Sequence, residues 1–169
     1  MGGQWGTLSM TAKEGRQAYP GLVGIQPTVM QDYVVDVVRT PAGHALAETR
    51  SFHLDLGSHR GDPTVGFNPV ETLLSALSAC LMTSLAMVSE MSRVPIERMR
   101  MTVRGTRQDK PPVLVAVQYH LVIDTDLPAE RIDRLIDLAQ RNSTVFQTLS
   151  LAVPVSGTWE IQHLSPGLS

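Results

Sequence analysis

The sequence predicts an α+β fold in which a mostly antiparallel sheet wraps around one long, apolar central helix. The first observation behind this prediction is the stretch Thr72 to Ser89, which carries no charge and consists mainly of helix-forming residue types. A helix that is apolar on all sides is buried in protein or lies in a membrane. The second observation is a set of short segments, before and after this stretch, in which apolar and polar residues alternate as in strands with one wet face. The order of strands, long helix, hairpin, helix and strand is typical of an α+β domain.

The composition fits one soluble domain. The chain has 169 residues, a net charge of −2 and 43% hydrophobic residues, which suits a single globular core. This balance does not call for nucleic acid or a membrane surface as a partner. The single cysteine excludes an intramolecular disulfide, and the first ten residues lack the basic and apolar regions of a secretory signal. We therefore expect a reducing, cytoplasmic location.

The N-terminal half contains two predicted strands. Residues 1–30 are rich in Gly, Gln and Ser and are expected to be an N-terminal extension, followed by a domain over 31–164 and a tail over 165–169. The Val-rich segment Gln31 to Arg39 predicts a strand that ends at a turn over 40–43. A second strand follows, and within Arg50 to Leu56 the apolar residues occupy one face. Asn68 and Pro69 are expected to be the cap and the first residue of the central helix.

The C-terminal half contains a predicted hairpin, a helix and a last strand. Pro95 ends the central helix, and alternation from Arg98 to Arg104 predicts a strand. After a polar turn over 105–112, its hairpin partner is expected to point five residues inward, namely Val115, Val117, Tyr119, Leu121 and Ile123. A second helix begins near Pro128 and breaks near Asn142; its apolar stripe is Ile132, Leu135, Ile136 and Ala139. A short helical turn over 144–149 and a last strand over 153–162 complete the pattern.

The uncharged stretch is also just long enough to cross a bilayer, since about 18 apolar residues meet that requirement. It is rich in Ser, Thr and Ala, and no cluster of Lys or Arg flanks it. Membrane helices are usually oriented by such flanking charges. A core helix is therefore favoured over a membrane span.

Few residues outside the central helix suggest chemistry. Cys80, inside the uncharged stretch, is either a small inert hydrophobe or a thiol activated by a cation from elsewhere in the fold, because its helical neighbours supply none. His53, Asp55 and His59 lack the paired spacing of a metal site. The basic residues of one predicted strand face lack interleaved aromatic residues, so nucleic-acid binding is not expected; they are Arg98, Arg100, Arg104, Arg107 and Lys110. Neither a metal nor another cofactor is expected.

One segment resembles a known family. The sequence Gly66-Phe67-Asn68-Pro69-Val70-Glu71-Thr72-Leu73-Leu74, with Cys80 eleven residues after the proline, is similar to the signature of the OsmC/Ohr family of osmotically inducible and organic hydroperoxide resistance proteins. The resemblance extends from about Gln31 to Gln162. It implies an intertwined homodimer in which two sheets enclose two central helices, with active sites at the subunit interface.

The resemblance also implies an activity and its residues. In the catalytic members the helix cysteine reduces organic hydroperoxides, an arginine favours its thiolate and a glutamate orients the arginine. Cys80 matches the attacking cysteine. Arg39 is the best match for the arginine, with Arg50 and Arg60 as weaker alternatives. Glu71 is the nearest carboxylate, although the family pattern has its glutamate where this chain has Val70. Nine residues of ideal helix rotate by roughly 180°, so Glu71 and Cys80 would point to opposite sides unless the first turn is irregular or Glu71 serves the partner subunit.

The main departure from the family pattern is Ser143, which stands where the resolving cysteine would be. Serine forms no disulfide, so the resemblance predicts a one-cysteine peroxidase recycled by an external thiol reductant. The alternative is a non-catalytic dimer that binds a small apolar ligand in its interface pocket. A third possibility is a dimer that only presents surfaces to protein partners.

Overall fold

The computed structural model describes residues 31–40, 43–57, 64, 66–94, 96 and 98–162. The chain divides into two units, 1–34 and 35–169. Of the first unit, the described residues 31–34 form neither helix nor strand. The extension predicted over 1–30 and the tail predicted over 165–169 lie outside the described residues.

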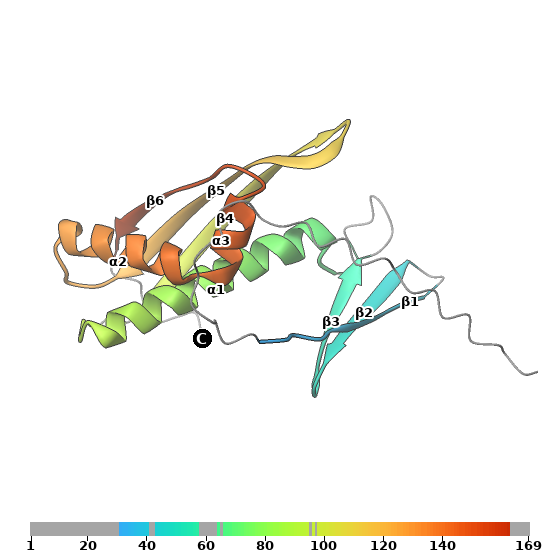
Figure 1. The fold of residues 1–169 in the computed structure, drawn as a ribbon, viewed down its shortest axis with the longest axis horizontal. Helices are drawn as coiled ribbons and strands as arrows, with labels where there is room; N and C mark the ends of the chain where they lie inside the picture. Colours follow the sequence, from blue (N-terminus) through green and yellow to red (C-terminus); the bar gives the residue numbers. More distant parts are fainter. Residues whose placement is uncertain are drawn as a thin grey trace, which may run out of the picture. The chain divides into compact units, whose positions relative to one another are not determined.

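The described residues of the second unit form two three-stranded sheets and three helices (Figure 1). The first sheet is formed by β1 (Asp36–Arg39), β2 (His44–Thr49) and β3 (Phe52–Gly57), all antiparallel. Helix α1 (Pro69–Met91) follows, and then come β4 (Arg98–Asp109), β5 (Pro112–Asp124), α2 (Ala129–Asn142), α3 (Thr144–Ser150) and β6 (Val155–Ile161). In the second sheet, β5 pairs antiparallel with β4 and parallel with β6. The predicted α+β class with a mostly antiparallel sheet is confirmed.

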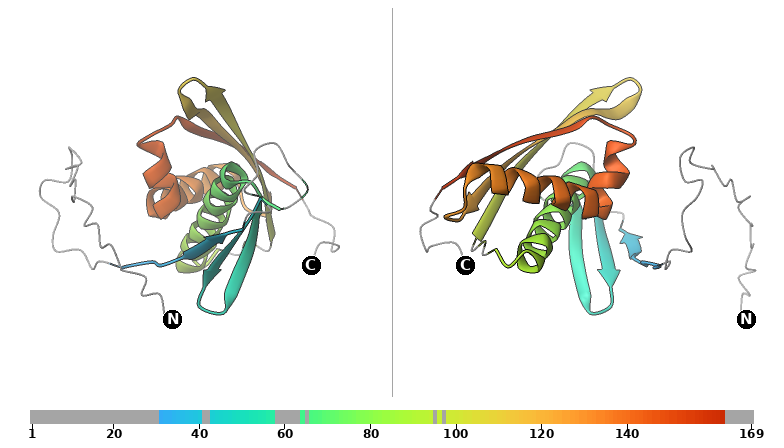
Figure 2. Two further views of the ribbon diagram at one scale, coloured as in Figure 1. Left: turned by 90° about the vertical axis from the view of Figure 1, so that its right-hand side faces the viewer. Right: turned by 60° about the vertical axis from the view of Figure 1, so that its left-hand side comes forward.

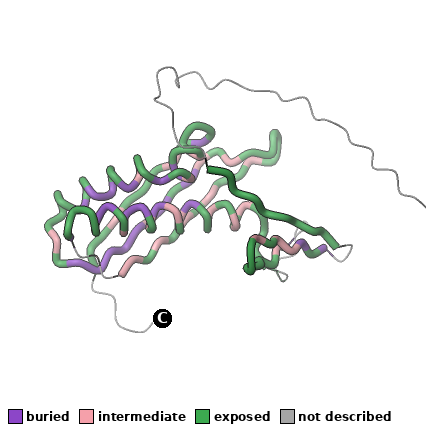
Figure 3. The backbone as a smooth tube through the Cα atoms, turned by 60° about the horizontal axis from the view of Figure 1, so that its bottom comes forward, coloured by how far each residue is buried: buried purple, intermediate pink, exposed green. Residues whose placement is uncertain are grey.

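The main core lies between the second sheet and the helices. Figure 2 shows α1, α2 and α3 on one face of this sheet. The inward residues of β5 belong to the same cluster as the apolar stripes of α1 and α2; they are Val117, Tyr119, Leu121 and Ile123. The predicted stripe of α2 is confirmed, because Ile132, Leu135, Ile136 and Ala139 are all buried. Burial in the described chain is concentrated in these elements (Figure 3).

Several strand predictions need correction. The N-terminal half has three strands in place of the predicted two, because a turn at Arg50 and Ser51 separates β2 from β3. The first strand begins at Asp36, five residues later than the predicted Gln31. Val115 does not point inward: it is 40% exposed. The register of β4 and β5 shifts between Thr106 and Arg107, so that Thr106 pairs with Ala116 and Arg107 with Leu114. A bulge of one residue exchanges the two faces of a strand, and Leu114 packs against the core in place of Val115.

Tyr119 packs over Gly157 between β5 and β6, and two side chains of these strands also hydrogen-bond to α2. Tyr119 is opposite Gly157 in the parallel pair, and a Cβ atom added to Gly157 would lie 2.0 Å from the Tyr119 ring atom Cζ. The missing side chain therefore leaves room for the ring. The Tyr119 hydroxyl accepts a 2.7 Å hydrogen bond from Gln140 Nε2 on α2. Trp159 of β6 adds a second link by donating to Asp133 Oδ1 on α2 at 2.8 Å.

Candidate active site

The site is built on α1, whose start is closed by a reciprocal cap. Asn68 Oδ1 accepts from the backbone N–H of Glu71, and Glu71 Oε2 accepts from the backbone N–H of Asn68, both at 2.9 Å. This capping box satisfies two backbone donors that a helix start otherwise leaves unpaired. Pro69 occupies the first helical position, where its missing N–H costs nothing. The predicted cap and first residue of the helix are confirmed.

Gly66 explains why the segment before the cap needs a glycine. Its φ is 135°, and an added Cβ would lie 2.7 Å from the carbonyl oxygen of Asp55 in β3. The close approach accompanies a bridge between Leu56 and Phe67, in which the Gly57 N–H donates to the Phe67 carbonyl at 3.0 Å. The Gly-x-Asn-Pro sequence therefore fixes the chain between the first sheet and the start of α1.

Cys80 lies at the boundary between the two sides of α1. The buried side consists of Leu77, Leu81, Ser84, Leu85, Val88 and Ser89. Because successive residues are about 100° apart on a helix, Cys80 falls between buried Leu81 and exposed Ala79. Its side chain is half-buried. Cys80 is thus neither sealed in the core nor fully open to solvent in a single chain.

The other side of α1 is exposed and carries no charge from Leu73 to Met87. It contains Leu73, Ala76, Ala79, Thr83 and Met87. Helix α1 is long and apolar enough to cross a membrane, and a third (33%) of its most apolar window is buried. Its buried side packs within the core cluster, as that of a core helix does. One chain therefore covers only one side of the predicted central helix.

The first sheet also has an uncovered apolar face, and Arg39 lies on it. The register pairs Val37 with Ala47 and Ala47 with Leu54, so these three side chains share one face. In the next row Arg39 pairs with Ala45, and Ala45 pairs with Leu56. Val37 and Leu54 are 57% and 40% exposed, whereas Ala45 beside Arg39 is buried at 7%. The core cluster includes no described residue of β1, β2 or β3, so most of this face is not covered by the core. Arg39 is therefore an exposed cation on an apolar sheet face.

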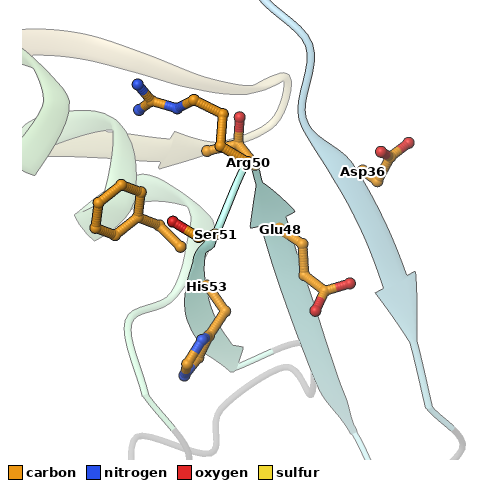
Figure 4. Close-up of a pocket in the computed structure, with 7 residues that line it drawn as sticks. Asp36, Glu48, Arg50, Ser51 and His53 are labelled. Carbon is orange, nitrogen blue, oxygen red and sulfur yellow. The ribbon is translucent and has the colours of Figure 1, made fainter.

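The two alternative arginines differ in position. Arg50 forms the turn between β2 and β3 with a positive φ of 54°, and its guanidinium lies 5.5 Å from the centre of the Phe52 ring. It borders a shallow hollow of about 340 Å³, which Figure 4 shows on the polar side of the sheet with Asp36, Glu48 and His53 from three adjacent strands. Arg60 lies outside the described residues.

Glu71 lies in the regular first turn of α1. Its carboxylate forms the capping box, and in the described chain no ion pair joins it to an arginine. Since Glu71 and Cys80 are nine residues apart on this helix, their side chains leave it in roughly opposite directions. The structure of one chain therefore brings together neither Glu71 and Cys80 nor, by any hydrogen bond or ion pair, Arg39 and Cys80.

Ser143 is fully buried between α2 and α3. It is the C-cap of α2 and the N-cap of α3. At the start of α3, its Oγ accepts a hydrogen bond from the Phe146 N–H at 3.4 Å. The hydroxyl has a structural role that a thiol fills poorly, because the preferred caps are oxygen acceptors. The described part of the chain holds no group of three or more His, Cys, Asp or Glu side chains arranged for a metal ion.

Fold and site together define a class: α+β proteins with a half-buried cysteine on a long helix that begins at a capped Gly-x-Asn-Pro turn. The chain belongs to the OsmC-like protein family, whose model matches residues 59–157. This result confirms the resemblance seen in the sequence. No curated protein matches the chain.

Solved structures share the fold at low sequence identity. An OsmC-like protein from Mycoplasma pneumoniae is 20% identical, with a TM-score of 0.74 over 80% of this chain and 100% of that one. An organic hydroperoxide resistance protein OsmC from Legionella pneumophila is 19% identical, with a TM-score of 0.65 over 79% and 99%. The organic hydroperoxide resistance protein OhrB of Bacillus subtilis is 18% identical, with a TM-score of 0.56 over 75% and 96%.

Proposed function

We propose that this OsmC-like protein reduces organic hydroperoxides with Cys80 as its sole redox-active thiol. The observation that carries the proposal is the position of Cys80, half-buried beside an uncharged, exposed side of the family helix. An apolar surface beside the nucleophile suits the hydrocarbon part of a hydroperoxide. The family includes proteins named for organic hydroperoxide resistance, which supports this substrate class.

The reaction needs one external reductant. The Cys80 thiolate attacks the outer peroxide oxygen, the O–O bond breaks, and the alkoxide leaves and takes a proton to become an alcohol. Cys80 is then a sulfenic acid. The chain has no other cysteine, so an external thiol displaces water to form a mixed disulfide. A second thiol, or the other arm of a dithiol, then releases the Cys80 thiol. Such reductants are cytoplasmic small molecules or proteins.

We further propose that the working unit is a homodimer. The apolar face of the first sheet and the uncharged side of α1 are both exposed in one chain. In a dimer, the sheet face of each copy can cover the uncharged side of α1 of the other copy. Both pairs of surfaces are then buried at once, as in a two-fold symmetric interface. Three strands without a covered apolar face are marginally stable in water, which supports the pairing.

The dimer gives Arg39 and Glu71 their roles. A sheet laid on the partner's α1 would bring its Arg39 to the thiol of the partner, where a cation favours the thiolate. Glu71 points away from Cys80 of its own chain, so it would act at the partner's thiol, where it would orient Arg39 of its own chain while its carboxylate also serves the cap. The roles of Arg39 and Glu71 both require that the sheet face carrying Arg39 and Val37 packs against the partner's α1.

The proposal is tested by following cumene hydroperoxide consumption with dithiothreitol as the reductant. The natural chain should turn over, and Cys80→Ser should show only the background rate, since it leaves no thiol. Arg39→Ala should slow the oxidation of Cys80, whereas Arg50→Ala serves as the matched control on the polar side of the same sheet. Consumption that survives in Cys80→Ser would rule out the mechanism. An inert Cys80 together with an apolar molecule retained in native mass spectrometry would instead support the ligand-binding alternative.

A further inference from the structure

Ser84 is a buried hydroxyl without a partner, one helical turn after Cys80. Its exposure is 6%, and its Oγ forms no hydrogen bond with any described residue. The other hydroxyls of α1 behave differently. Thr72, Ser75 and Ser78 each donate to the carbonyl four residues earlier, at 2.8–2.9 Å, Ser89 donates to the Ala86 carbonyl at 2.8 Å, and Thr83 is exposed.

An unsatisfied buried hydroxyl is unfavourable, because it has lost its hydrogen bonds to water without replacing them. Ser84 therefore calls for a partner that the described part of the chain does not supply. Residues four apart on a helix have neighbouring side chains, and helical side chains lean towards the N-terminal end. From this spacing we infer that the Ser84 hydroxyl can reach the turn that carries Cys80, on the side of the thiol that faces the core.

We propose that Ser84 is a positioning residue that donates a hydrogen bond to the Cys80 sulfur once the thiolate forms. This inference rests on the proposed thiol chemistry and adds a donor from the same helix. A hydrogen bond to an anion is stronger than one to a neutral group, and a donor to the charged form favours that form. The thiolate would accept the hydrogen bond that the buried Ser84 hydroxyl lacks, and this hydrogen bond would stabilise the thiolate.

The surroundings leave little else to favour the thiolate from within the chain. Helix α3 has no titratable residue. Helix α2 buries only apolar side chains on its packed stripe, and its charged residues are all exposed; they are Glu130, Arg131, Asp133, Arg134, Asp137 and Arg141. Strand β4 contributes Met99, Met101 and Val103 to the core. The charged residues of α1 itself, Glu71 and Glu90, are exposed and would disfavour a thiolate. The Ser84 hydroxyl complements the Arg39 guanidinium that the dimer would supply.

The test measures the thiolate directly through its absorbance near 240 nm as a function of pH. Cys80 is the only cysteine, and subtraction of the Cys80→Ser titration removes the tyrosine signal. Ser84→Ala should raise the titration midpoint by about one pH unit and lower the thiolate fraction near neutral pH about tenfold. Its stability should hold or rise, because an unsatisfied hydroxyl is removed. Ser84→Thr, which keeps the hydroxyl, should keep the natural midpoint.

Ser89→Ala is the matched control. Ser89 is as deeply buried on the same helix, at 3% exposure, but it already has a partner. This variant should lose stability and keep the midpoint. An unchanged midpoint in Ser84→Ala, or an equal rise in Ser84→Thr, would overturn the inference. The titration contains no peroxide, so failure of the peroxidase proposal would appear separately, as a natural chain whose thiolate forms but does not react with hydroperoxide.

Discussion

Ser143 combines a change in chemistry with a structural role at a single residue. The resemblance to the OsmC/Ohr pattern implies a resolving cysteine at this position, whereas this chain has a hydroxyl that caps the start of α3. The sequence predicts the missing disulfide directly, because it needs only the residue type. The capping role was missed, although a serine directly before a helical segment is a typical signal for it. Ser143 therefore stabilises the helix pair that packs on α1, and under the proposed mechanism it also leaves the chain without a second thiol.

Tyr119 makes a prediction about stability at high pH. Burial raises the pKa of Tyr119 above its usual value of 10.0, with Asp137 adding to the rise and the Gln140 hydrogen bond opposing it. The unfolded chain releases this proton near pH 10 and the folded chain only at higher pH, so the unfolded state binds fewer protons there. The free energy of unfolding should therefore fall as the pH rises above 10.

Tyr119→Phe should weaken that fall, and it should cost about 1 kcal/mol near neutral pH because Gln140 loses its partner. Urea unfolding at neutral pH and above pH 10 measures both effects. Tyr33→Phe is the control, since Tyr33 is 84% exposed. An identical pH dependence in the natural chain and Tyr119→Phe would contradict the role given to this tyrosine.

At the scale of elements, local patterns predicted the helices better than the strands. The start of α1 and the stripe of α2 follow from caps and helical spacing, which depend on residues close in sequence. The exposure of Val115 and the parallel pairing of β6 could not be predicted this way, because they depend on a register shift and on pairing across α2 and α3. The site divides similarly: Cys80 was found from its motif, whereas the shared face of Arg39 and Val37 needed the pairing of β1 with β2.

Glu71 allows the cap of α1 to be separated from the chemistry. Glu71→Gln keeps a side-chain oxygen for the Asn68 N–H but removes the negative charge. We expect the unfolding free energy to change by less than about 1 kcal/mol, while the oxidation of Cys80 slows because the activating arginine loses its carboxylate. Stopped-flow oxidation and urea unfolding measure the two effects. Glu90→Gln is the control, at an exposed carboxylate of the same helix. A rate equal to that of the natural chain would leave Glu71 with the capping role alone.

At the scale of the whole molecule, the exposed apolar surfaces predict the oligomeric state. Sedimentation should give about twice the 18.4 kDa mass of one chain. Leu54→Asp should reduce the mass towards that of a monomer, because it places a charge in the apolar face of the first sheet. His53→Asp, on the opposite face of the same strand, should leave the mass unchanged. A monomeric natural chain, or a dimer that tolerates Leu54→Asp, would contradict the proposed interface.

If Cys80 is a nucleophile suited to organic hydroperoxides, this property will be seen in the rate at which the reduced protein is oxidised. Cumene hydroperoxide and hydrogen peroxide are compared at equal concentration, with the sulfenic acid trapped by dimedone and counted by intact mass. We expect one dimedone adduct per chain, at Cys80, to form much faster than on a free thiol, and faster with cumene hydroperoxide than with hydrogen peroxide. Oxidation no faster than that of a free thiol, or without preference for the organic peroxide, would contradict it.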